Sequence, residues 1–451
     1  MAFSKNTGKG FHKHTQVMLL FTLLMFVENF AFSQVAAPAD SLKEDSLRIM
    51  AARQLKLRND SMLRTQYDIG NLYNDLFRPH RKRDTVKKKS SGITVIPNVA
   101  ANPSIGSQIG IKAVAGRVLG TDPTTLMSVG ATSASITTKG IIYFYINHNV
   151  FTNANKWNLQ GSIIAAKTVT PDFGLGIGRA ANGSTEDQIL SDPNRKGYVL
   201  HSQFYSLRER VYKQIEDNLF LGAGVSFDIR RKIEDRAATN NQLTPYHIYS
   251  DRYGIDPDNY MANGLLFNVE YTTRDNQNRA YKGIYADAGF RINQTWIGST
   301  KNAVQFTVDV RKYWSLSKRN PEHVLAFWNW GSAIISGAVP YLELPGTGKD
   351  PSLRSGRGYI IGYFKAPQFY YSELEYRFPI TRNKFISGVT FANVQTANDE
   401  MGTKIFRQWQ PAAGGGLRVL FNKATRTNLC LDYAFGRYGS KGFFLGLNEA
   451  F

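Results

Sequence analysis

The sequence predicts an all-β fold, a transmembrane antiparallel β-barrel of about sixteen strands that follows a short periplasmic segment. Two observations support this prediction. The final residues alternate between apolar side chains and small or polar ones with a period of two, as in a strand that has lipid on one side and water on the other. The chain also carries 28 Phe, 23 Tyr, 6 Trp and 39 Gly, a composition that suits aromatic girdles and glycine-rich turns.

The first element is an export signal, predicted for residues 1–33. It combines a basic start, an apolar run over residues 17–27 and small residues before an expected cleavage site after Ser33. The apolar run is too short to cross a bilayer as a helix. The basic residues of the start are Lys5, Lys9 and Lys13.

The second element, residues 34–96, is predicted to be a polar periplasmic segment, partly helical or disordered. Residues 41–64 have the composition of a short helix, although their apolar stripe is poor. Residues 78–89 carry a dense group of Arg and Lys. Two interpretations of this group stay open: a contact with phosphate or lipid headgroups, and a solvated linker.

The third element is the barrel itself, predicted for residues 97–451. Alternating patterns and β-favouring residues predict about fifteen strands. Because single-chain bacterial barrels have an even number of strands, a sixteenth is expected, with residues 173–178 contributing to it. The fifteen strands are expected at residues 107–118, 126–136, 141–150, 157–169, 198–212, 219–230, 265–273, 283–294, 303–314, 324–338, 368–378, 385–394, 414–421, 428–436 and 442–451.

The last of these strands is predicted to close the barrel. Its apolar face is expected to contact lipid, with the final aromatic residue at the membrane interface. That face consists of Phe443, Leu445, Leu447 and Phe451. The alternative for this strand alone is the edge of a soluble β-sandwich, but the same pattern recurs along the chain.

Charge and motifs exclude several classes of function. The net charge is +20 at pH 7, yet an exported chain is not expected to bind nucleic acid. Lipopolysaccharide and other outer-membrane lipid, an acidic periplasmic partner and an anion-preferring lumen fit the charge better. The only cysteine, Cys430, can form no internal disulfide and is expected to fill space in the lumen. Nucleophile-elbow, zinc-protease and phosphate-loop motifs are absent, so neither an enzyme nor a cofactor or metal site is predicted.

A resemblance to a known family begins within residues 339–380. This stretch carries Arg357-Gly358-Tyr359 and then Glu-Tyr-Arg-Phe-Pro at residues 375–379. It resembles the bacterial surface antigen family, the barrel domain shared by BamA, TamA and the two-partner-secretion transporters. Further motifs agree in the family's order over about residues 102–451: Tyr-Thr-Thr-Arg-Asp-Asn at 271–276, Gly-Gly-Gly-Leu-Arg at 414–418 and Leu-Cys-Leu-Asp-Tyr at 429–433.

The resemblance implies a site inside the barrel. In the family, a long loop folds into the lumen with its Arg-Gly-Phe/Tyr motif at the tip, here Arg357, Gly358 and Tyr359. The family's carboxylate that accepts the loop arginine is replaced in this chain by an amide, Asn393. A buried guanidinium still needs an anion. Glu375 and Asp432 are the expected partners, because strand alternation places both on the lumen side.

The resemblance also implies a function in the outer membrane: moving or inserting a macromolecule, with a seam between the first and last strands that opens. Assembly by the barrel assembly machinery is expected. The relatives carry POTRA modules before the barrel, and residues 34–96 are too short for a convincing one. A separate periplasmic partner is therefore expected to supply that role. Two alternatives stay open: a passive anion-preferring pore, and a structural or adhesive surface protein that uses long loops such as residues 231–263.

Overall fold

The computed structural model describes residues 64–78, 93–122, 124–178, 184–191, 197–238, 243–400 and 402–451, together with residues 50, 54 and 61. Asn59–Phe451 forms one compact unit. In the other unit, Met1–Arg58, only Met50 and Gln54 are described, and both are helical and exposed. The predicted export signal, almost all of the expected helix at 41–64 and the basic residues after Arg78 lie outside the described residues.

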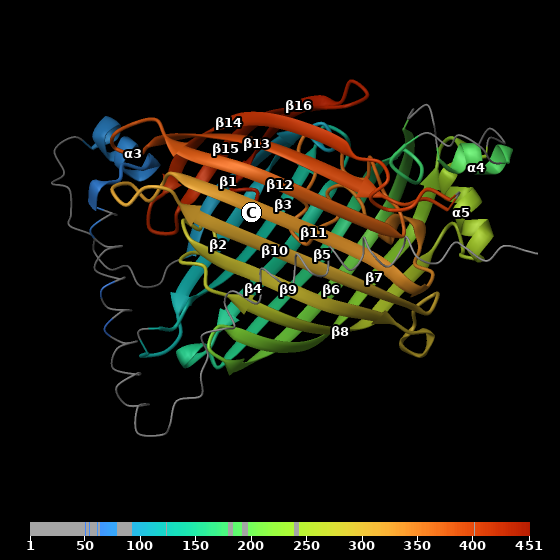
Figure 1. Ribbon diagram of the computed structural model, residues 1–451, viewed down its shortest axis with the longest axis horizontal. Coiled ribbons are helices and arrows are strands. Elements are labelled where there is room, and N and C mark those ends of the chain that lie inside the picture. The colour runs from blue at the N-terminus through green and yellow to red at the C-terminus, as the bar shows by residue number, and fades with distance from the viewer. Residues whose placement is uncertain are drawn as a thin grey trace, which may run out of the picture. The chain divides into compact units, whose positions relative to one another are not determined.

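Sixteen strands form a closed antiparallel barrel in which each strand pairs with the next along the chain and β16 returns to β1 (Figure 1). The predicted fold class is therefore confirmed. The strands are β1 (Ile93–Asn102), β2 (Gly106–Val118), β3 (Met127–Thr137), β4 (Ile142–Phe151), β5 (Trp157–Asp172), β6 (Tyr198–Glu216), β7 (Leu219–Asp235), β8 (Tyr260–Thr272), β9 (Gly283–Asn293), β10 (Ala303–Ser315), β11 (Val324–Gly337), β12 (Gln368–Pro379), β13 (Ile386–Ala397), β14 (Gln410–Asn422), β15 (Thr427–Gly436) and β16 (Lys441–Leu447).

The sixteenth strand is not the one that the sequence predicted. It is β1, which begins at Ile93, before the expected start of the barrel at residue 97. Residues 173–178 instead leave the end of β5, and Leu175 and Ile177 among them are buried. The prediction for residues 173–178 is wrong because Gly174 and Gly176 have φ values of 79° and 84°. Such left-handed conformations turn the backbone out of the extended form.

The two faces of the strands differ as a membrane barrel requires. On β15, Leu431, Tyr433 and Phe435 are exposed on the outside, whereas the residues between them are buried. Lipid covers the outer side chains of such a barrel, and polar side chains face its interior.

Short helices lie at the two ends of the barrel (Figure 1). At one end, α3 (Ile69–Phe77) packs near the turn between β14 and β15, where Lys423 Nζ donates to Asn71 Oδ1 over 2.9 Å. Because the connection between β14 and β15 at this end is a short turn, we call this the periplasmic end. At the other, extracellular end lie α4 (Thr185–Leu190) and α5 (Pro245–Tyr253). No helix among the described residues is both long enough and apolar enough to cross a membrane. The described part of the chain also contains three single-turn 3-10 helices: η1 (Asn153–Asn155), η3 (Thr295–Ile297) and η4 (Tyr341–Glu343).

Candidate functional site

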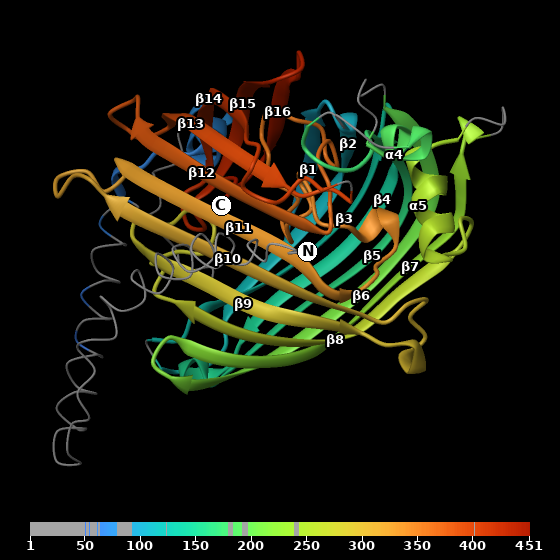
Figure 2. The same cartoon turned by 45° about the vertical axis from the view of Figure 1, so that its right-hand side comes forward.

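The connection between β11 and β12, residues 338–367, folds back into the barrel, and we call it the lumen loop. Orange loop segments of this part of the chain lie within the ring of strands in Figure 2. Its base is fixed by an ion pair of 2.7 Å between Lys365 Nζ and Asp172 Oδ1 at the end of β5. Near the tip, the Asp350 carboxylate accepts the backbone N–H groups of Arg354 and Ser355 over 2.9 and 2.7 Å. These bonds make the loop compact and give its tip a fixed shape.

Arg357 lies at the tip of the lumen loop and is 5% exposed. Its guanidinium contacts three carboxylates: it donates to Asp432 Oδ2 over 2.8 Å and makes close ion pairs with Glu373 and Glu375. It also lies over the ring of Phe391, 3.6 Å from the ring centroid. The structure thus brings Arg357 to Glu375 and Asp432, the two acids expected from the sequence, and adds Glu373.

The other predicted residues of the motif hold the tip in place. Asn393 Nδ2 donates to the backbone carbonyl of Arg357 over 3.0 Å, so the amide anchors the main chain rather than the guanidinium. Gly358 has a φ of 105°, and a Cβ there would come 2.7 Å from Ala412 Cβ, which only glycine avoids. The Tyr359 hydroxyl donates to the Pro411 carbonyl over 2.7 Å.

A chain of alternating charges continues from Arg357 toward the periplasmic end. Asp432 also pairs with Arg418, whose Nε donates to Glu449 Oε2 over 2.7 Å. Arg279 Nε lies 3.4 Å from Glu449 Oε1. All of these side chains are buried. Buried charges need partners of opposite sign, so the members of this chain depend on one another.

The C-terminal residues are part of this network, which corrects one prediction. Phe443 is 59% exposed on the outside, as expected for the closing strand, and Leu445 and Leu447 are partly exposed. Phe451, in contrast, is buried inside, 5.2 Å from the ring of Trp328. Its backbone oxygen accepts a bond of 2.8 Å from Arg377. The assignment of Phe451 to the lipid face is wrong because Asn448 has a φ of 69°, which ends β16 and turns the chain inward.

Several members of the network were not predicted as site residues. Glu373 shares the inward face of β12 with Glu375, so strand alternation alone could have identified it. Glu449 breaks the alternation of the final residues, and this irregularity was the only sequence feature that could have identified it as a site residue. Arg279 lies in the connection between β8 and β9, where no periodic pattern applies. Its contact with Glu449 joins segments too distant in sequence for any local pattern to predict.

The wall formed by β6–β10 carries its own charged residues. Arg291 Nη1 pairs with Asp228 Oδ2 over 2.7 Å, and Arg311 Nη2 pairs with Asp309 Oδ2 over 2.6 Å. No group of His, Cys, Asp and Glu among the described residues has the arrangement of a metal site. Among the described residues, the ion pairs of the lumen are most densely connected in the cluster around Arg357.

The seam between β1 and β16 differs from the other strand junctions. Within the described strands, a single residue pair, Ala101 with Leu445, joins β1 to β16. On its other side β1 pairs with β2 from Ile93 to Asn102. Because β16 ends at Leu447, the periplasmic part of β1 has no β16 residue opposite it. This edge of β1 leaves backbone groups without a strand partner.

A family model described as the Omp85 superfamily domain matches residues 179–451. No curated protein matches the sequence. The fold is similar to a crystal structure of BamA from Haemophilus ducreyi lacking POTRA domains 1–3, with a TM-score of 0.51 and 12% identity over 80% of this chain and 70% of that one. It is also similar to CdiB from Escherichia coli, with a TM-score of 0.50 and 8% identity over 80% and 68% of the two chains. The family model covers more than half of the chain, and the protein therefore belongs to the Omp85 superfamily.

Proposed function

We propose that this integral outer-membrane barrel inserts or translocates a macromolecule, and that the β1–β16 seam is where the client engages. The single residue pair at the seam is the observation that carries the proposal. Unpaired backbone groups in a membrane are costly, so an edge of this kind favours pairing with another strand. Opening the seam breaks far fewer bonds than opening any junction with a full ladder. The proposed activity is not enzymatic and needs no cofactor.

Partners follow from the same proposal. A separate periplasmic protein hands the client to the barrel, in the role that POTRA modules have in the relatives. The barrel assembly machinery inserts the protein itself into the membrane. The periplasmic mouth offers α3 as a contact for a partner, because Leu76 and Phe77 are 65% and 69% exposed.

The seam can be tested with a disulfide that links β1 to β16 and can be reduced again. Cysteines introduced by Ala101→Cys and Leu445→Cys occupy directly paired positions, so a disulfide fits between them. The native Cys430 is buried. In cells that carry only this variant, we expect oxidation to disturb the outer-membrane protein profile and reduction to restore it. The control is the pair Val114→Cys and Ala131→Cys, which joins β2 to β3. An unchanged profile with the seam locked would contradict the proposal.

A passive anion-preferring pore is the second candidate, favoured by the arginines of the lumen wall. The buried lumen loop and the inward-turned C-terminus argue against a wide permanent channel. In planar bilayers we therefore expect low, flickering conductance that rises when residues 340–366 are deleted. Stable, large, anion-preferring conductance of the unaltered protein would favour the pore instead.

A further inference from the structure

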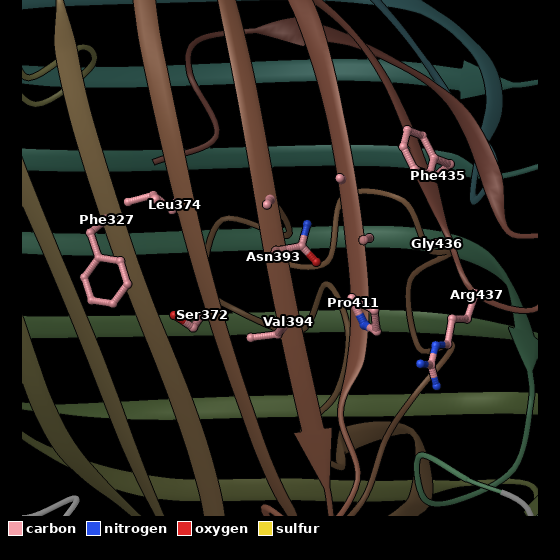
Figure 3. A pocket seen from close by; sticks show the side chains of 12 residues that line it. Phe327, Ser372, Leu374, Asn393, Val394, Pro411, Phe435, Gly436 and Arg437 are labelled. Carbon is pink, nitrogen blue, oxygen red and sulfur yellow. The ribbon is translucent and has the colours of Figure 1, made fainter.

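A groove of about 510 Å³ lies across β11–β15, on the outside of the barrel (Figure 3). Its floor and walls come mainly from outward-facing side chains, and its exposed surface is almost entirely apolar. It is distinct from the cluster around Arg357, which lies on the inner side of the same strands. A depression on a surface that faces lipid holds lipid rather than water.

Side-chain size along neighbouring strands creates the groove. One row of cross-strand neighbours runs Phe327, Leu374, Ala392, Ala413 and Phe435. Large residues at both ends of this row flank two alanines, and the hollow lies above the alanines. The next row toward the extracellular end, Ser372, Val394 and Pro411, is also built from small or compact side chains. The hollow therefore extends along two rows and is long enough to take part of an extended chain.

Aromatic residues fix the depth of the groove in the membrane. Tyr370, Phe406 and Trp409 lie beyond its extracellular edge, with ring centroids 5.6 Å apart for Tyr370 and Phe406 and 5.8 Å apart for Phe406 and Trp409. Clusters of this kind mark the level of the headgroups. The groove consequently lies among the acyl chains of the outer leaflet, directly below the headgroup region.

Arg437 supplies a positive charge near the level of the lipid headgroups. It lies at the end of the groove, on the side of Pro411 (Figure 3). It is exposed and has no carboxylate partner among the described residues. Its backbone N–H donates to the Tyr359 hydroxyl over 2.9 Å, so the lumen loop holds the strand end that carries it. An arginine at this position matches a phosphate group, which it can bind through two hydrogen bonds.

We propose that the groove binds an acyl chain of a phosphorylated glycolipid of the outer leaflet, with Arg437 on its phosphate. The apolar lining accounts for the chain, and the guanidinium accounts for the phosphate. A protein strand fits less well, because the backbone groups of β12–β15 are already paired in ladders on both sides. The site would make the surface around the last strands a place where one lipid stays bound.

The experiment is native mass spectrometry of the full chain in mild detergent. The probes are lipid A, its dephosphorylated form, phosphatidylglycerol and inorganic phosphate. We expect lipid A to remain bound, with occupancy falling about ten-fold on dephosphorylation. Ala413→Phe fills the hollow and should abolish binding of lipid A. Arg437→Gln should remove the preference for the phosphorylated form and leave weak binding of both.

The matched controls are two substitutions elsewhere on the outer surface. Ala134 on β3 is an exposed alanine between large neighbours, and Arg117 is an exposed arginine at the periplasmic end of β2. Ala134→Phe and Arg117→Gln should leave lipid A occupancy unchanged. The proposal is overturned if Ala413→Phe retains lipid A as well as Ala134→Phe does. Equal occupancy by phosphatidylglycerol, or binding of phosphate alone, would also overturn it.

Discussion

Replacing Arg357 by alanine is expected to destabilise the folded barrel and to release the lumen loop. The substitution leaves three buried carboxylates, Glu373, Glu375 and Asp432, without their shared cation. Breaking a buried ion pair costs about 3–5 kcal/mol, and nearby water lowers this toward the smaller figure. The measurements are the melting temperature of the heat-modifiable band and protease cleavage within residues 346–356. An exposed arginine, Arg407, provides the control, and Arg407→Ala should change neither.

The three carboxylates are not equivalent, which permits a sharper test. Glu375 retains Arg377 and Asp432 retains Arg418, whereas Glu373 has Arg357 as its only basic partner among the described residues. Neutralising Glu373 should therefore rescue more of the damage in the Arg357→Ala variant than neutralising Asp432 does. The comparison is Arg357→Ala/Glu373→Gln with Arg357→Ala/Asp432→Asn. Equal melting temperatures for these two double variants would mean that the charges are not distributed as the structure indicates. Normal stability and loop protection in Arg357→Ala itself would make the loop an ordinary surface loop.

The sequence predicted most of the barrel because lipid on one side and water on the other impose a period of two on every strand. β1 was not predicted as a strand because it contains Pro97 and follows a polar segment. Proline usually argues against a central strand, since it lacks the N–H that a ladder needs. In this barrel Pro97 is tolerated because the strand has a full ladder on one side only. Pro97 thus made β1 difficult to predict, and it is tolerated there because β1 is only weakly paired with β16.

The site could be predicted from the sequence only in part, because only some of its signals are local. Motif resemblance placed Arg357, and alternation placed Glu375 and Asp432 on the lumen side, because both signals are local. The links from Asp432 through Arg418 to Glu449 depend on how distant segments meet inside the barrel. No pattern along a single strand specifies contacts between such distant segments. Asn393 shows the limit of motif transfer, since it occupies the family's acid position but binds the Arg357 backbone.

The lumen loop and the last strand are connected through these charges. Arg354 Nη2 donates to the backbone oxygen of Leu447, the last residue of β16, over 2.9 Å. Glu449, two residues later, is held by Arg418, which also pairs with Asp432 beside Arg357. Movement of the loop tip would therefore disturb the groups that hold the end of β16. If the seam opens as proposed, these contacts would let the C-terminal residues help to keep it closed.

The second large effect is expected from Phe451→Ala. The Phe451 ring is buried against Trp328 and lies 6.1 Å from the ring of Tyr313. Truncating a buried phenylalanine typically costs about 3–5 kcal/mol, because a cavity remains where the ring packed. The loss should appear as a lower urea midpoint of unfolding and as easier removal of the C-terminal residues by carboxypeptidase.

Phe443→Ala is the matched control, because it removes the same kind of ring from the lipid-facing side of β16. Phe443 is 59% exposed and packs mainly on Tyr433, with 4.8 Å between the ring centroids. Its truncation leaves no enclosed cavity, since lipid can fill the space, and should lower the urea midpoint much less. The two variants separate the two possible positions of the chain end. If Phe451 faced lipid, both substitutions would have similar small effects and carboxypeptidase sensitivity would not change. A clearly larger effect of Phe451→Ala would instead place the ring in the lumen, where it helps to fasten β16 beside the seam.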